Sequence, residues 1–141
     1  MRWLLTASAC TAALVLTGCG GGGGGSIAFP FVDWAGTYSG QMTYHYDGAP
    51  DVVGTATFTL DGNGVGLGSF ADTVHHDNYT VNAQLNVSGQ LQIYLRKSMG
   101  EYFAGAGTSR ITDGVRSFDL EIRDLPTENP PHFTGTVTRQ N

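Results

Sequence analysis

Apolar and polar residues alternate with a period of two along most of the chain after residue 36. In the stretch 37–46, Tyr38, Met42 and Tyr44 fall on one side, and threonine, serine and glutamine fall on the other. Successive side chains of a β-strand point to opposite faces, so this pattern predicts strands with one dry face. By this criterion strands are predicted at 37–46, 53–60, 64–70, 79–88, 91–95, 102–107, 118–123 and 133–138.

Turn-forming residues separate these segments. Glycine or proline marks the breaks at 47–48, 61–64, 88–89, 99–100, 113–114 and 129–131, and an aspartate-asparagine pair marks the break at 77–78. No segment has a convincing helical period. Eight strands of this length in an up-and-down order favour a small antiparallel β-barrel, because closure pairs the two edge strands. A β-sandwich is the alternative.

The first 26 residues are expected to stand apart from this domain. Residues 1–18 have the pattern of a secretory signal peptide, with Arg2, an apolar centre and small residues after it. The segment 19–26 consists of a cysteine, six glycines and a serine. It can bury too little apolar surface to offset the conformational entropy that the chain would lose on ordering. A flexible tether of this length has a reach of about 15 Å. The folded domain is therefore expected over 27–141.

The sequence Leu16-Thr17-Gly18-Cys19 resembles the lipobox of bacterial lipoproteins. The resemblance implies cleavage before Cys19, a diacylglyceryl group on its thiol and, usually, a further fatty acyl chain such as palmitate on the new amino terminus. Two or more acyl chains give stable membrane anchoring. In related Gram-negative lipoproteins an aspartate after the cysteine favours the inner membrane; here Gly20 implies the outer membrane.

The stretch "DWAGTYSG" at the start of the first strand resembles the opening of the calycins, the lipocalin and avidin group. Their G-x-W motif begins an eight-stranded up-and-down barrel. Here the triplet ends in Tyr38 instead of tryptophan, Gly36 begins it, and Trp34 stands two residues earlier. In lipocalins a basic residue of the last strand covers that tryptophan at the base of the barrel. The resemblance implies this role for Arg139.

Calycins bind ligands inside the barrel, but an empty pocket of roughly 300 Å³ would cost on the order of 7 kcal/mol. That is comparable with the whole stability of a small domain. A mostly filled interior with binding at the rim or outer wall is therefore preferred over an internal pocket.

Candidate chemical sites are few. Residues 61–72 have a partial EF-hand spacing, but Val65 and Asp72 replace expected ligands, so a hairpin turn explains them better. His75, His76 and Asp77 could bind a metal only from a loop, and an exposed polar loop is the preferred interpretation. His45 and His132 have no ligand pattern around them. Since no nucleophile elbow, zincin motif or phosphate loop is present, we expect no enzyme activity, metal or cofactor.

The net charge of the chain limits the partners that it can bind. The chain from Cys19 onward has six basic and twelve acidic residues, a formal charge of −6, which would repel nucleic acid and anionic headgroups. Membrane contact is then expected through the lipid on Cys19.

The favoured function is a non-catalytic binding module for a small molecule or protein in the cell envelope. The alternative is a structural or assembly subunit of an envelope complex.

Overall fold

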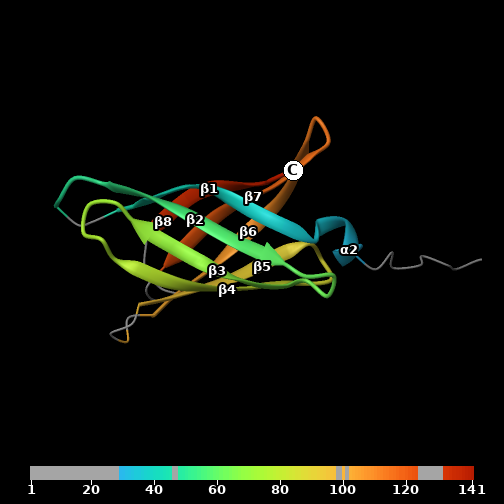
Figure 1. Cartoon of the computed structure of the whole chain (residues 1–141), viewed down its shortest axis with the longest axis horizontal. Coiled ribbons are helices and arrows are strands. Elements are labelled where there is room, and N and C mark those ends of the chain that lie inside the picture. Colours follow the sequence, from blue (N-terminus) through green and yellow to red (C-terminus); the bar gives the residue numbers. More distant parts are fainter. Residues whose placement is uncertain (1–28, 46–47, 98–99, 101, 124–131) are drawn as a thin grey trace, which may run out of the picture.

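The chain folds into a closed antiparallel β-barrel (Figure 1). The computed structural model describes residues 29–45, 48–97, 100, 102–123 and 132–141. Within them the elements are α2 (Phe31–Trp34), β1 (Gly36–Tyr44), β2 (Val52–Leu60), β3 (Val65–Asp72), β4 (Asn78–Leu85), β5 (Gln90–Lys97), β6 (Tyr102–Thr112), β7 (Val115–Arg123) and β8 (Phe133–Arg139). Each strand pairs with the next, and β8 pairs with β1. The predicted eight-stranded barrel is confirmed, and its closure excludes the sandwich. The architecture is consistent with the calycin resemblance.

The up-and-down order gives the barrel two different ends. The base holds α2, the turns after β2, β4 and β6, and the end of β8. The mouth holds the connections after β1, β3, β5 and β7.

The period-two alternation decides which residues fill the barrel. Burial alternates strictly along β2 and β4, where each predicted inward residue from Gly54 to Leu60 and from Tyr79 to Leu85 is buried. The five largest fully buried side chains are aromatic: Tyr38, Phe58, Phe70, Phe118 and Phe133. Burying each contributes about 1.5–3 kcal/mol, so the interior supplies the main stabilisation of the fold.

Turn chemistry explains the tight reversals at the base. At the β6–β7 turn, Asp113 and Gly114 have φ angles of 51° and 79°. Two consecutive left-handed residues form the type I′ turn that matches the twist of a hairpin. At the β2–β3 turn, one carboxylate oxygen of Asp61 accepts hydrogen bonds from the amides of Asn63 and Val65, at 2.8 and 2.9 Å.

Glycine allows the two glycine-rich strands to approach their neighbours closely. A Cβ atom at Gly105 of β6 would overlap the carbonyl oxygen of Glu121 on β7. A Cβ atom at Gly68 of β3 would overlap the carbonyl oxygen of Thr57 on β2. Both segments form the strands that the sequence predicts, and these glycines let the sheet bend tightly enough to close.

Several boundaries differ from the sequence prediction. Val87 was expected on the dry face of a strand over 79–88, but β4 ends at Leu85 and Val87 is 73% exposed in a turn. The reason is local: the Asn86 side chain accepts hydrogen bonds from the amides of Ser88 and Gln90 and closes the turn early. Strand β6 runs to Thr112, five residues beyond its predicted end, and α2 adds one helical turn before β1.

Candidate functional site

The base of the barrel brings together the four residues of the calycin-like opening. Trp34 and Tyr38 are both buried, and the Tyr38 hydroxyl donates a hydrogen bond of 2.9 Å to the Trp34 carbonyl oxygen. Arg139 donates to the carbonyl oxygen of Asp33 at 3.1 Å. Gly36 has a φ of +140°, and a Cβ atom there would collide with the Arg139 guanidinium. The motif residues therefore form a packed closure.

A second arginine at the base was not anticipated from the sequence. The guanidinium of Arg116, on β7, lies 5.7 Å from the centre of the Trp34 ring. Burial raises the pKa of Tyr38, and the charges of Arg139 and Arg116 partly oppose that shift. A basic side chain does lie over the tryptophan, but it comes from β7 and not from the final strand. Only the strand register of the folded barrel identifies it.

The interior near the mouth is also filled. Phe133 stacks on Tyr44 with ring centres 4.3 Å apart, and its edges meet the rings of Phe70, Tyr79 and Phe103 at 5.0–5.8 Å. These side chains occupy the volume that an internal ligand of the lipocalin kind would need. A binding site has to be sought outside this cluster.

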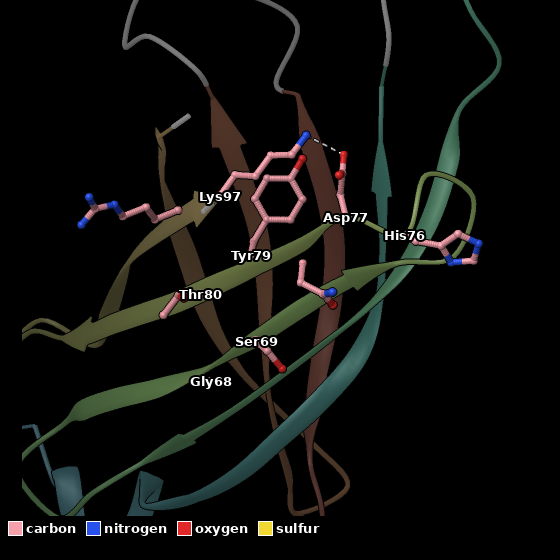
Figure 2. A pocket seen from close by; sticks show the side chains of 9 residues that line it. Gly68, Ser69, His76, Asp77, Tyr79, Thr80 and Lys97 are labelled. Carbon is pink, nitrogen blue, oxygen red and sulfur yellow. Dashed lines mark hydrogen bonds and ion pairs between the residues drawn. The ribbon is translucent and has the colours of Figure 1, made fainter. Parts of the chain in front are cut away.

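A polar pocket of about 640 Å³ lies where the outer wall of β3, β4 and β5 meets the mouth (Figure 2). We call it the β3–β4 pocket. Its lining residues are Gly68, Ser69, His76, Asp77, Asn78, Tyr79, Thr80, Arg96 and Lys97. The volume is within the range of small-molecule sites, and the lining is richer in hydrogen-bonding and charged groups than most such sites.

The loop at one side of the pocket is held by the buried carboxylate of Asp72. That carboxylate accepts hydrogen bonds from the backbone amides of Val74 and His75, at 2.6 and 3.0 Å, and contacts the His75 ring nitrogen at 3.0 Å. Burial raises the pKa of Asp72, but these hydrogen bonds outweigh it and the pKa is lowered overall. The loop is therefore built around an ionised aspartate.

The same loop places two polar residues at the pocket. His76 adopts a left-handed conformation with a φ of 56°, which is uncommon for a residue other than glycine. Asp77 holds the Lys97 ammonium at 2.7 Å, and that ammonium lies 6.0 Å from the centre of the Tyr79 ring. Figure 2 shows the Lys97 side chain beside the Tyr79 ring, with its ammonium joined to the Asp77 carboxylate. The rim of the pocket is thus fixed by contacts across β4 and β5.

The floor of the pocket is a row of outward-facing residues in register. Ser69 of β3 lies opposite Thr80 of β4, and Thr80 lies opposite Arg96 of β5. All three are exposed. Neither hydroxyl has a side-chain hydrogen bond within the described residues, and Arg96 has no ion pair there. These groups are available to a ligand.

Of the residues that line this pocket, the sequence analysis singled out only His76 and Asp77. His75, His76 and Asp77 were considered as a metal cluster, and the structure places them in an exposed loop, as preferred. Among the described residues no group of three or more histidine, cysteine, aspartate or glutamate side chains is arranged to hold a metal. The EF-hand-like spacing is not one loop, because β3 separates Asp61 at the base from Asp72 at the mouth.

The predicted anchor lies outside the described residues. Cys19, the signal segment 1–18 and the tether 19–26 all belong to the part of the chain that is not described. Within the described ranges, no helix has the length and apolar character needed to cross a bilayer.

Comparison with models of known protein families gives no match, and comparison with curated proteins finds no relative of this chain.

Proposed function

We propose that this chain is a lipid-anchored, non-catalytic binding module of the bacterial cell envelope, with the β3–β4 pocket as its ligand site. The observation that carries the proposal is the contrast between two regions. The barrel interior is filled by aromatic and aliphatic side chains, whereas the outer wall carries a polar pocket of about 640 Å³ whose hydroxyl and guanidinium groups have no side-chain partner among the described residues. Such groups bind a ligand at little cost, because no internal partner has to be displaced.

The anchor rests on the lipobox-like sequence ending at Cys19. Acyl chains on this cysteine would hold the protein in the membrane, and Gly20 favours the outer membrane by the same resemblance. The tether 19–26 leads toward Phe29, which packs at the base against Trp34 with ring centres 5.5 Å apart. The chain therefore enters the barrel at its base, and the β3–β4 pocket lies at the opposite end, the mouth.

The ligand site is tested by native mass spectrometry of the full-length protein, purified in detergent from its own host. We expect a bound small molecule on the wild type that is lost in Thr80→Trp, because the indole fills the pocket. Gln84→Trp is the matched control, since Gln84 is exposed on the same strand but does not line the pocket. No adduct on the wild type, or equal adducts on both variants, would contradict the proposal.

The anchor is tested separately. We expect Cys19→Ser to abolish fatty acid labelling and to leave an unprocessed or membrane-detached protein. Cys10→Ser is the control, because Cys10 lies in the segment that is expected to be removed. Normal labelling and outer-membrane fractionation of Cys19→Ser would refute lipidation at this residue.

A further inference from the structure

We propose that the β3–β4 pocket binds an acidic saccharide, with the anionic group on Arg96 and a sugar ring against the stacked tyrosine pair of half-buried Tyr94 and exposed Tyr102. This inference rests on the proposed binding function and adds the chemical class of the ligand.

The first observation is the unpaired charge of Arg96. Every other basic side chain in the described part of the chain has a carboxylate, a carbonyl oxygen or an aromatic ring as partner. Those pairs are Lys97 with Asp77, Arg110 with Asp119, Arg123 with Glu121, Arg139 with the Asp33 carbonyl, and Arg116 with Trp34. Arg96 is exposed and lines the pocket. A free guanidinium is suited to bidentate binding of a carboxylate or phosphate.

The second observation is an aromatic platform beside that arginine. Tyr94 and Tyr102 stack with ring centres 5.6 Å apart and an interplanar angle of 23°. Tyr102 lies opposite Arg96 in the register of β5 and β6, and it is 50% exposed. Its neighbour on the outer face, Ala104, is small. The apolar face of a sugar ring can lie on such a platform while the phenol hydroxyl remains hydrated.

The third observation is the state of the hydroxyl and amide groups in the pocket. Elsewhere on the outer wall, neighbouring hydroxyls pair with each other, as Thr37 does with Thr59 at 2.9 Å. Within the described residues, the side chains of Ser69, Asn78 and Thr80 have no such partners. They can therefore donate to and accept from the hydroxyls of a saccharide, and the three groups lie on the same two strands.

The charge of the whole chain selects among anionic ligands. Among the lining residues that the structure describes, Arg96 and Lys97 against Asp77 leave one net positive charge, whereas the chain has a formal net charge of −5. A nucleic acid with a charge on every nucleotide is repelled by that field. One anionic group close to Arg96 is attracted, because screening over about 8 Å weakens the more distant carboxylates. The observations favour an acidic saccharide over a polynucleotide.

The test is titration calorimetry of the full-length protein in detergent at about 0.15 M salt, where the Debye length is about 8 Å, with three probes. Aldotetraouronate carries rings and a single carboxylate, xylotetraose carries rings alone, and inorganic phosphate carries charge alone. We expect aldotetraouronate to bind at least tenfold more tightly than either of the other two. Arg96→Gln should remove the preference over xylotetraose, and Tyr102→Ala should weaken both oligosaccharides. Arg110→Gln is the matched control, because Arg110 is an exposed arginine outside the pocket, and it should bind like the wild type.

Equal binding of the two oligosaccharides, phosphate binding as tight as that of aldotetraouronate, or preserved discrimination by Arg96→Gln overturns the inference. Absence of binding by all three probes also overturns it. A host-derived ligand without a sugar, lost in Thr80→Trp, would overturn this inference and leave the binding function standing. A pocket that captures no host ligand at all would remove the proposed function as well.

Discussion

The hydroxyl of Tyr38 donates a hydrogen bond to the carbonyl oxygen of Trp34 across 2.9 Å, and both residues are buried at the base of the barrel. This bond ties α2 to β1. It satisfies a carbonyl at the end of a single helical turn, where no further turn follows to supply a donor.

Tyr38→Phe is expected to lower the free energy of unfolding by about 1–3 kcal/mol, because the Trp34 carbonyl oxygen loses its buried donor. Urea denaturation, followed by tryptophan fluorescence and by circular dichroism, measures this effect. Tyr102→Phe serves as the control, since that hydroxyl is on the exposed outer wall and its removal should change stability by less than about 0.5 kcal/mol. Equal losses in the two variants would mean that the Tyr38 hydrogen bond contributes nothing specific.

Glycine-to-alanine substitutions should differ strongly in how much they destabilise the barrel, depending on how closely the neighbouring strand approaches the glycine. Gly105→Ala forces a Cβ atom onto the Glu121 carbonyl oxygen, so the strand pair must shift and stability should fall by about 2–3 kcal/mol. At Gly62 the nearest atom to a new Cβ is 3.9 Å away on Val32, so Gly62→Ala should be nearly neutral. Thermal and urea unfolding of the two variants give the comparison. A neutral Gly105→Ala would contradict the close approach of β6 and β7.

The filled interior predicts a cavity when its central aromatic residue is truncated. Phe133→Ala should lower stability by about 3–5 kcal/mol, because four neighbouring rings lose their contacts and only partly collapse. The variant should also bind xenon inside the barrel, and the wild type should not. Xenon-induced chemical shift changes report this directly. Xenon binding inside the wild-type barrel would show that open interior volume exists.

The Asp72 carboxylate predicts a particular dependence of stability on pH. Its pKa is lowered in the folded state, so its stabilising contribution is complete above the pKa of an unfolded aspartate, about 3.9. That contribution is lost as the pH falls through the lower folded value. Asp72→Asn should cost about 1–3 kcal/mol at pH 7, since the amide cannot replace all three hydrogen bonds.

Chemical denaturation of wild type and Asp72→Asn between pH 7 and pH 2 tests this linkage. We expect the difference between the two proteins to be constant down to about pH 4 and to shrink below it. A difference that grows on acidification would mean that the carboxyl is protonated more readily in the folded state than in the unfolded chain.

Strand positions and inward faces were predictable from the sequence, because alternation of period two is a local property of each segment. The stretch from Gly54 to Leu60 shows this: every residue expected inside is buried. The Asp113-Gly114 turn was predictable for the same reason, since the backbone conformation of these two residues is their own preference. Val87 was misplaced because the Asn86 side chain, and not the alternation, decides where β4 ends.

The tertiary structure alone decided which residues meet across strands. Ser69, Thr80 and Arg96 become neighbours through the register of β3, β4 and β5, and Arg116 reaches Trp34 only once the barrel has closed. A one-residue slip of any pairing would reverse the faces and separate these groups. Register depends on the combined packing of all eight strands, so the sequence pattern of a single strand does not contain it. The barrel fold could therefore be predicted from the sequence, but the β3–β4 pocket could not.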